Sequence, residues 1–166
     1  MSNISKSEEL NNIYEPFIEL LHELCDVSGE IITQYFRKNI PVKDKLDKGP
    51  QIFSPVTEAD KNSEQAIRQL INKTYPDHGI RGEEYGDEQT DSEYVWVIDP
   101  IDGTKAFITG FPTWGTLIAL QKNGVPIIGA MNQPFIGERF IGKPGKATLN
   151  NEPISTRKCY QLSDAI

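Results

Sequence analysis

The sequence predicts an α+β fold, in which helices from the N-terminal part pack on one face of a mostly antiparallel β-sheet meander. Apolar residues recur at three- and four-residue steps over 9–37 and again over 57–74, which is the period of an α-helix. From about residue 94 onward, short apolar runs alternate with turns rich in Gly, Pro and Asn, which is typical of successive strands. Helices followed by a run of strands indicate the α+β class.

Composition limits the size and the partners of the protein. A length of 166 residues allows one domain, and 37% hydrophobic with 25% charged residues fits a soluble globular protein. A net charge of −7 argues against nucleic-acid binding through a basic face and against attachment to anionic lipid. No apolar run approaches the roughly 20 residues of a membrane span. Two distant cysteines, Cys25 and Cys159, favour reduced thiols and a cytoplasmic location.

The first helix is predicted over 9–37, with Pro16 expected to mark its start or a kink, because proline in a helix interior costs about 3 kcal/mol. A short strand is expected over 40–43, followed by an exposed loop. That loop could act as a flap that places one lysine near an anionic ligand; the candidates are Lys43, Lys45 and Lys48.

The second helix is predicted to begin at Thr57 and to continue to Thr74. Thr57 and Asp60 have the spacing of a capping box, in which each side chain bonds the other residue's backbone N–H. These local signals favour Asp60 as a first-turn carboxylate stabilised by the helix dipole. The face expected to point inward carries Ala66, Ile67, Leu70 and Ile71.

The remaining elements are short. Residues 87–93 are predicted to be an acidic loop without chemistry, and Lys122-Asn123-Gly124 predicts a tight hairpin between strands at 114–121 and 125–132. Pro126 indicates an edge strand or an early strand position. Further strands are expected over 138–143 and within 147–156, and residues 163–166 are predicted to lead into another strand.

The chemistry centres on the apolar strand that ends in Asp99-Pro100-Ile101-Asp102. A helical turn after Pro100 would aim Asp99, Asp102 and the Ile101 carbonyl at one small volume. Two anions this close repel each other, and a hard divalent cation such as Mg²⁺ relieves that repulsion. Upstream, Glu83 and Glu84 follow Gly82, which allows a turn or a close backbone approach. Taken alone, such a glutamate pair indicates surface charge.

Gly103 and Thr104 are expected to begin a short helix, whose free N–H groups bind phosphate. Metal ligands and a phosphate cradle therefore lie within six residues. Two metals about 3.5–4 Å apart neutralise phosphoryl oxygens and lower the pKa of a bound water. The local pattern thus supports metal-assisted hydrolysis of a phosphate ester as a hypothesis.

Three motifs in fixed order resemble the inositol monophosphatase family: residues 55–60, 82–84 and 96–104. The resemblance extends from the first helix to Ile166. It implies the N-terminal half of a layered αβαβα sugar-phosphatase fold. Residues 1–166 would form a single α+β metal- and phosphate-binding domain, and the sequence would stop at the start of the family's C-terminal α/β domain.

The resemblance also implies a set of metal-ligand roles. Glu83, Asp99 and the Ile101 carbonyl would bind one Mg²⁺, and Asp99 and Asp102 would bind a second. A Trp-Asp motif from the second half of the family fold, whose aspartate completes the second site, has no counterpart in this sequence.

The implied catalytic roles fall on neighbouring residues. The backbone N–H groups of Gly103 and Thr104 would hold the phosphate. The Thr104 hydroxyl and Asp60 would help to activate water, with Glu84 as a close supporting carboxylate. Asp60 would then both cap its helix and act in catalysis.

Residues 107–112, 114–120, 133–134 and 137–139 resemble the histidinol-phosphatase branch, although such core and turn residues also fit other branches. Histidinol phosphate is therefore preferred as substrate, with inositol monophosphate next. The alternative is an inactive remnant that binds metal, phosphate or a partner chain. A homodimer, or another association through the sheet face that the second half normally covers, is expected; neither nucleic acid nor membrane is.

Overall fold

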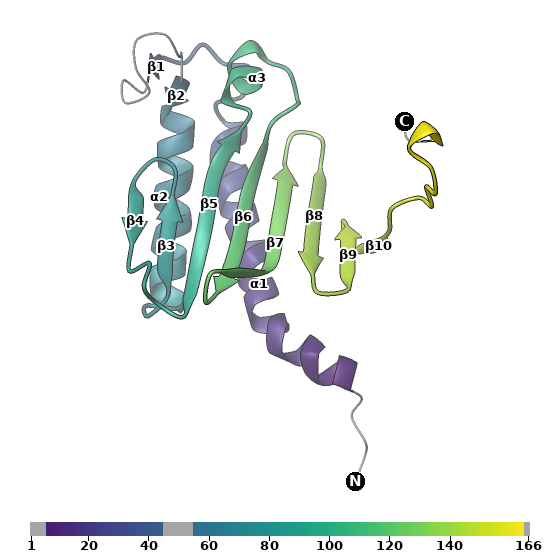
Figure 1. Cartoon of the computed structure of the whole chain (residues 1–166). Coiled ribbons are helices and arrows are strands. Elements are labelled where there is room, and N and C mark those ends of the chain that lie inside the picture. The colour runs from purple at the N-terminus through teal and green to yellow at the C-terminus, as the bar shows by residue number, and fades with distance from the viewer. Residues whose placement is uncertain (1–5, 45–54, 165–166) are drawn as a thin grey trace.

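The computed structural model describes residues 6–44 and 55–164 and confirms the α+β class. Two helices, α1 (Lys6–Thr33) and α2 (Glu58–Thr74), lie side by side on one face of an eight-stranded sheet (Figure 1). A two-stranded antiparallel sheet of β1 (Val42–Asp44) and β2 (Pro55–Thr57) precedes α2. The short helix α3 (Thr104–Thr109) follows β5, and a 3₁₀ turn spans Leu162–Asp164.

The large sheet has the order β10-β9-β8-β7-β6-β5-β3-β4. Adjacent strands of this sheet are antiparallel, except that β3 and β5 run parallel to each other. The hairpin of β3 and β4 forms one edge, and the chain returns beside β3 as β5. The strands are β3 (Gly79–Gly82), β4 (Gly86–Glu88), β5 (Tyr94–Asp102), β6 (Gly115–Lys122), β7 (Val125–Gln133), β8 (Glu138–Lys143), β9 (Lys146–Leu149) and β10 (Glu152–Ile154).

Helix α1 begins at Lys6, so the predicted start near Pro16 is wrong, and it ends at Thr33 instead of residue 37. Proline removes one backbone hydrogen bond from a helix, and Pro16 is exposed, so its ring does not disturb the core. The turns that follow it are anchored by Leu21 and Leu24, which are fully buried. Burial of this apolar face outweighs the local cost of the proline.

Several strand predictions are confirmed and one is corrected. Asn123 and Gly124 both have positive φ, as the predicted tight hairpin requires. Pro126 occupies an early position of β7, beside a register shift opposite Gln121. The predicted acidic loop over 87–93 is wrong at its start, because residues 86–88 pair with β3 as β4. Leu162–Asp164 is a 3₁₀ turn and residues 165–166 lie outside the described part of the chain, so the predicted lead-in to a strand stays a prediction.

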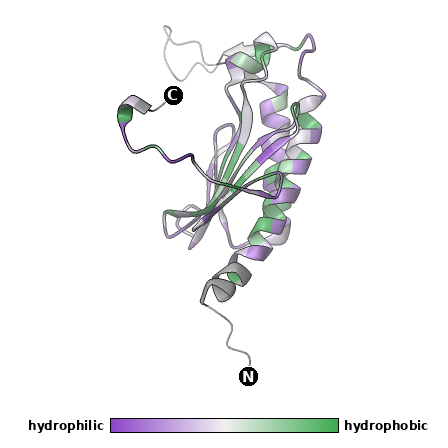
Figure 2. Cartoon of the chain, turned by 90° about the vertical axis from the view of Figure 1, so that its right-hand side faces the viewer, coloured by the Kyte–Doolittle hydropathy of each residue, from purple (hydrophilic) through white to green (hydrophobic). Residues whose placement is uncertain are grey.

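The main core lies between the helices and the sheet. Ile67 and Ile71 of α2 are fully buried, as predicted, whereas Ala66 and Leu70 are only half-buried. Figure 2 shows the hydrophobic side of the helices turned toward the sheet. A smaller cluster under α3 joins Phe36, Phe107 and Trp114. Among the helices in the described part of the chain, none is both long and apolar enough to cross a membrane.

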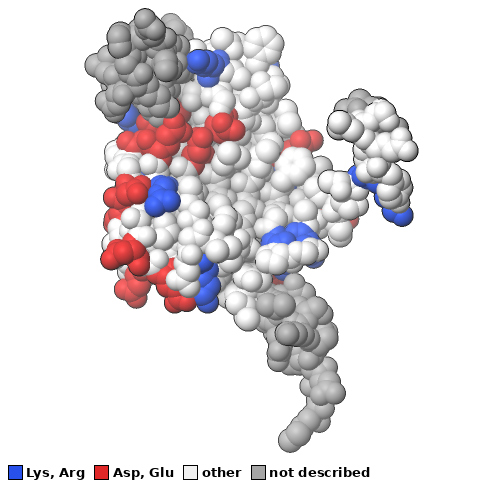
Figure 3. Space-filling model, viewed as in Figure 1, with Lys and Arg blue, Asp and Glu red and all other residues white. Residues whose placement is uncertain are grey.

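The opposite face of the sheet is not covered by any described helix. Leu117 and Met131 on this face are 36% and 42% exposed, and they line an apolar hollow of about 490 Å³. Figure 3 views this face: its middle lacks charged side chains, and acidic side chains gather toward the β3–β4 edge. Asp99 lines the same hollow. An uncovered apolar surface therefore borders the acidic residues.

Candidate metal and phosphate site

The parallel pairing of β3 with β5 brings the upstream glutamates beside the central aspartates. Gly82 is paired with Ile98, and the Glu83 N–H donates to the Ile98 carbonyl at 3.3 Å. Glu83 therefore lies next to Asp99, because parallel strands end at the same edge of a sheet. This placement depends on a pairing between segments 16 residues apart in the sequence.

Asp99 is the electrostatic centre of the group. Burial, and then the charges of Glu83, Asp102 and Asp60 together with a side-chain hydrogen bond to Glu83, raise the pKa of Asp99 to about 8. The Asp99 Oδ1 atom is buried and has no hydrogen-bond partner. A carboxylate oxygen in this condition, facing other carboxylates, fits a hard cation such as Mg²⁺.

These carboxylates are close enough to act on one another but do not form a finished coordination shell. Within residues 6–44 and 55–164, no three Asp, Glu, His or Cys side chains already surround one point closely enough to hold a metal. The raised pKa of Asp99 and its unpaired Oδ1 atom indicate that a cation would stabilise this group of carboxylates. To coordinate a cation, the carboxylate oxygens must move closer together. Side-chain rotation would draw these oxygens around a bound ion.

A β-bulge aims Asp99 and Asp102 to the same side, so the predicted helical turn after Pro100 is wrong. Strand β5 continues to Asp102, and its pairing with β6 shifts between Asp99, opposite Leu117, and Asp102, opposite Gly115. Three steps on β5 therefore match two on β6. Residues three apart in a regular strand face opposite sides, and one extra residue restores the same side.

The bulge is held by a chain of buried hydroxyl groups. The Thr116 hydroxyl donates its proton to the Pro100 carbonyl at 2.8 Å and therefore accepts from the Ser28 hydroxyl at 3.0 Å. Ser28 in turn accepts from the Ser63 hydroxyl at 3.0 Å. The Ile101 side chain is buried, and its carbonyl accepts a hydrogen bond from the Thr104 hydroxyl at 3.1 Å. A carbonyl oxygen has two lone pairs, so this bond leaves Ile101 able to bind a cation as well.

Gly103 and Thr104 stand at the start of the short helix α3, as the sequence predicts. Gly103 has φ +86°, and a Cβ there would lie 2.9 Å from the Thr113 carbonyl oxygen, so glycine is required at this position. Thr104 is the first residue of α3, which has six residues. A helix this short contributes its free N–H groups more than a large dipole.

Asp60 has the local role that its spacing predicts. Its Oδ2 atom accepts from the Thr57 N–H at 2.8 Å and from the Thr57 hydroxyl at 2.6 Å, which confirms the capping box. Asp60 is buried, and its charge contributes to the raised pKa of Asp99. The same side chain therefore caps α2 and faces the aspartate group.

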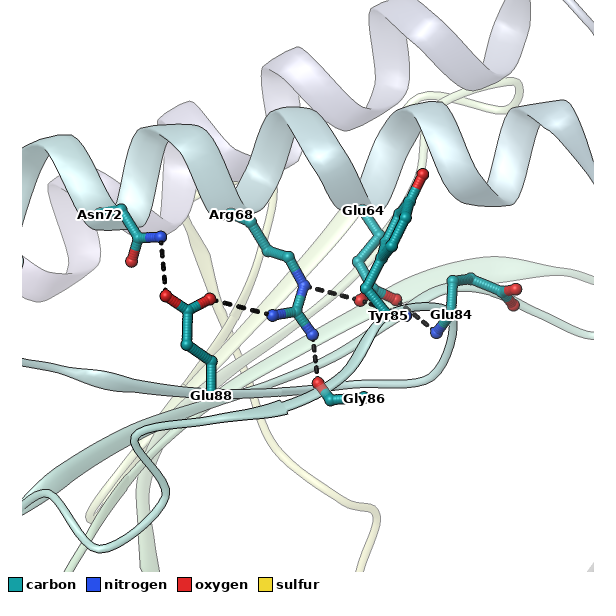
Figure 4. A network of polar contacts seen from close by, with 7 residues as sticks. All are labelled: Glu64, Arg68, Asn72, Glu84, Tyr85, Gly86 and Glu88. Atoms are coloured by element: carbon teal, nitrogen blue, oxygen red, sulfur yellow. Dashed lines mark hydrogen bonds and ion pairs between the residues drawn. The ribbon is translucent and has the colours of Figure 1, made fainter.

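Two residues that matter for this geometry were missed from the sequence: Glu64 and Arg68. They continue a series that starts at Asp60, in which a polar residue recurs every four positions along α2 up to Asn72. Polar residues four apart lie on one helix face, and such a series within an amphipathic helix is the signal that could have identified them. Figure 4 shows Glu64 and Arg68 between α2 and the turn that carries Glu84.

A separate polar pocket of about 410 Å³ lies between α1 and the β7–β8 hairpin. Arg139 fills one side of it, donating to Asn132 Oδ1 at 2.9 Å and pairing with Asp26 at 2.5 Å, with His22 Nδ1 3.1 Å from its guanidinium. These groups satisfy one another and tie α1 to the sheet. We assign this pocket a structural role.

The fold and the acidic group beside a Gly-Thr helix start together define the class to which the sequence motifs point. Residues 13–166 match the model of the inositol monophosphatase family, and the chain belongs to this family. It is 48% identical over 168 residues to the protein named bifunctional phosphatase IMPL2, chloroplastic, of Arabidopsis thaliana; the match covers 99% of this chain and 47% of that protein.

Other relatives give the same picture. A histidinol-phosphatase of Chlorobaculum parvum is 39% identical over 84% of this chain and 52% of its own length. A solved inositol monophosphatase from Zymomonas mobilis has a TM-score of 0.73 and 42% identity, covering 88% of this chain and 55% of that one. One from Anabaena has a TM-score of 0.74 and 32% identity, covering 90% and 52%. The chain thus spans about half the length of these relatives.

Proposed function

We propose that this chain carries the metal- and phosphate-binding half of a Mg²⁺-dependent phosphomonoesterase. The single observation that supports this proposal most directly is Asp99, whose buried oxygen lacks a partner and whose pKa is raised to about 8 with Glu83, Asp102 and Asp60 contributing. Oxygen ligands of this kind favour Mg²⁺ over softer metals. Membership of the inositol monophosphatase family supports the same class of reaction.

In this proposal the acidic residues hold two or more Mg²⁺ ions. The ligands are Glu83, Asp99, Asp102 and the Ile101 carbonyl. Bound Mg²⁺ would neutralise phosphoryl oxygens and make a water molecule more acidic. The Gly103 and Thr104 N–H groups would orient the phosphate. Flap lysines Lys45 and Lys48 lie outside the described residues, as does the side chain of Lys43.

Water activation is proposed for Asp60 and the Thr104 hydroxyl, with Glu84 nearby. Thr57 holds the Asp60 Oδ2 atom through two hydrogen bonds, so the orientation of the carboxylate is fixed before substrate arrives. The Thr104 hydroxyl donates a hydrogen bond to the Ile101 carbonyl, which is itself a proposed metal ligand. This bond keeps the hydroxyl beside the proposed metal site. Such preorganisation lowers the cost of reaching the transition state.

We prefer histidinol phosphate as the substrate, with inositol monophosphate next. The names of two relatives support this preference: one is called a bifunctional phosphatase and the other a histidinol-phosphatase. Gln133, one of the residues that resemble the histidinol-phosphatase branch, is buried; its amide donates to the Pro112 carbonyl and accepts from the N–H groups of Phe135 and Ile136. Its contacts organise loops near Asp102 and do not themselves select a substrate.

Association through the uncovered sheet face is part of the proposal. The apolar hollow that contains Leu117 and Met131 also reaches Asp99, so a covering partner, such as a second copy, would border the metal site. The relatives are about twice as long as this chain, which supports a need for further structure on this face. A cytoplasmic location stays a prediction, favoured by two free cysteines.

Phosphate release from histidinol phosphate and from inositol monophosphate, with Mg²⁺, tests the proposed activity. We expect release by the wild-type chain and a loss of more than about a hundredfold for Asp102→Asn, because losing even an outer-shell partner of a metal costs 10–100-fold. Molar mass measured by light scattering on the same samples will show whether active material is associated.

The second candidate function is binding of metal or phosphate without catalysis. It is favoured by the apolar sheet face that the described helices leave uncovered beside Asp99. No phosphate release above the Asp102→Asn background at high protein concentration, together with retained stabilisation by Mg²⁺, would establish this alternative.

Stabilisation by Mg²⁺ is expected to increase with pH. In the metal-free protein the pKa of Asp99, about 8, lies above its value of about 3.9 in an unfolded chain. The stability that this group contributes is complete below the unfolded pKa and is lost as pH rises through the folded one. Because Mg²⁺ requires the carboxylate anion, its apparent dissociation constant should fall by up to about tenfold per pH unit between pH 6 and 8.

Thermal melts with and without Mg²⁺ at pH 6, 7 and 8 measure this effect, with NaCl of equal ionic strength as the control. An increase in Tm with Mg²⁺ that is constant or smaller at pH 8 would contradict the assignment of Asp99 as a metal ligand.

A further inference from the structure

A buried carboxylate on α2 binds the turn that carries the proposed metal ligands. Glu64 is fully buried. Its Oε2 atom accepts from the Glu84 N–H at 2.7 Å, and its Oε1 atom accepts from the Tyr85 N–H at 3.1 Å and from Arg68 Nε at 2.8 Å (Figure 4). The two backbone contacts fall directly after Glu83. The Glu64 side chain therefore determines where the 83–86 turn begins.

Arg68 holds the other end of the same turn. Its guanidinium donates to the Gly86 carbonyl and to Glu88 Oε2, the latter at 3.3 Å, and Asn72 Nδ2 donates to Glu88 Oε1 at 3.4 Å. The Arg68 side chain is only 12% exposed. Figure 4 shows the Glu84 carboxylate extending away from this network while its backbone N–H points into it. The turn is thus fastened at both ends to one helix face.

Space for this arrangement is provided by Gly82. A Cβ at this position would lie 2.0 Å from Glu64 Oε1 and 2.6 Å from Arg68 Nη2. Gly82 does not have positive φ, so close approach of the carboxylate is the reason for glycine here. Burying an ionised carboxylate is unfavourable unless several donors satisfy it, and here two backbone N–H groups and a guanidinium do so.

A hairpin at the edge of a sheet does not need a buried ion pair to form, since a short turn is normally satisfied by its own backbone bonds and by water. The position of the turn relative to α2 is what the network adds. Asp60 lies one helical turn before Glu64 on α2, so the same helix places Asp60 and the Glu83–Glu84 backbone.

We propose that Glu64, supported by Arg68, is a positioning residue that sets Glu83 and Glu84 against Asp60 and Asp99 for Mg²⁺ binding. This inference rests on the proposed function. Glu64 does not touch the metal or the substrate; it acts through the backbone of the residues that do. Outer-shell partners of this kind typically contribute 10–100-fold to metal affinity.

The variant Glu64→Gln tests this role, with direct Mn²⁺ binding as the readout. The amide keeps the size of the side chain but turns an N–H₂ group toward donors, so it cannot accept all three hydrogen bonds. We expect the Mn²⁺ dissociation constant, measured by electron paramagnetic resonance of free Mn²⁺ and by competition with Mg²⁺, to rise about 10–100-fold. In the same variant, raised Mg²⁺ should restore phosphatase activity, whereas a smaller folded fraction would not be rescued in this way.

Asp87→Asn is the matched control. It changes the net charge by the same amount and lies in the hairpin that Glu64 contacts, but it removes an exposed pair, Arg81 with Asp87, whose side chains are 51% and 52% exposed. Mn²⁺ affinity should stay within about twofold of the wild type, because exposed pairs contribute little. Equal losses in both variants would overturn the proposal in favour of a general charge effect.

Hydrogen exchange provides a second measurement. The Glu84 and Tyr85 amides should lose protection in Glu64→Gln but not in Asp87→Asn. If Glu64→Gln folds poorly, Arg68→Gln tests the same network with Glu64 in place, and a weaker loss of Mn²⁺ affinity is expected.

This inference alone would be overturned if folded Glu64→Gln bound Mn²⁺ as tightly as the wild type. If only Arg68→Gln folds, wild-type Mn²⁺ affinity in that variant would overturn it in the same way. Failure of the wild-type chain to bind Mn²⁺ would overturn the proposed function and the inference together.

Discussion

Replacing Asp99 by asparagine is expected to stabilise the metal-free protein and to abolish its Mg²⁺-dependent activity. Burial and the charges of Glu83, Asp102 and Asp60 disfavour the Asp99 anion and raise its pKa to about 8. Asparagine cannot ionise, so the free energy of unfolding should rise by roughly 1–2 kcal/mol near pH 8, a common gain for relieving such a conflict. Activity should fall by more than about a hundredfold, because a direct ligand matters more than its outer-shell partners.

The pH dependence of the stability gained by Asp99→Asn tests whether the Asp99 anion destabilises the metal-free protein. Below about pH 4 aspartate is protonated in both folded and unfolded chains, so the two proteins should have similar stability there. The difference should grow as pH rises from 4 toward 8, as chemical denaturation in the absence of Mg²⁺ can measure. Asp91→Asn, on an exposed part of the acidic segment, is the control and should change stability little. A destabilised Asp99→Asn at pH 8 would contradict our account of this carboxyl group.

Gly82→Ala is expected to be among the most destabilising single-methyl additions in the described part of the protein. The new Cβ would lie 2.0 Å from Glu64 Oε1, and this carboxylate cannot move away without losing the N–H groups of Glu84 and Tyr85. Overpacking combined with disruption of a buried charged network should cost roughly 2–4 kcal/mol of unfolding free energy. This corresponds to a fall in Tm of about 5–15 °C for a domain of this size.

Gly142→Ala is the matched control, because it adds the same methyl group to a strand of the same sheet. Its backbone does not have positive φ, and a Cβ there would meet no atom within 4 Å. We expect its Tm to stay close to that of the wild type. If Gly82→Ala melts no lower than Gly142→Ala, the 83–86 turn is not held against α2 as tightly as the contacts indicate.

Local patterns predicted the helices, the Thr57–Asp60 capping box and the hairpin at Asn123-Gly124, since each depends on residues close in the sequence. The proximity of Asp99 and Asp102 was also anticipated, but for the wrong reason: a β-bulge, not a helical turn, aims them together. A bulge depends on how β5 pairs with β6, and single-strand patterns do not reveal pairing register.

The meeting of Glu83 with Asp99 was predicted only through family resemblance. Its physical basis is the parallel pairing of β3 with β5, a long-range choice that the local sequence leaves open. Glu64 and Arg68 were missed because polar residues on an amphipathic helix usually face water. Their partners include backbone groups of a turn 20 residues away, so recognising them requires the folded arrangement.

Helix α2 and strand β5 carry different acidic residues of the proposed site. Asp60 and the Glu83–Glu84 turn are both attached to this helix, whereas Asp99 and Asp102 belong to β5. A small slide of α2 along the sheet would move Asp60 relative to Asp99 and Asp102, whereas the backbone hydrogen bond from Glu83 to Ile98 keeps Glu83 beside β5. The distance from Asp60 to Asp99 and Asp102 therefore depends on how α2 packs on the sheet, and substitutions in the apolar layer beneath α2, such as at Ile67, become a means of changing that distance without replacing an acidic residue.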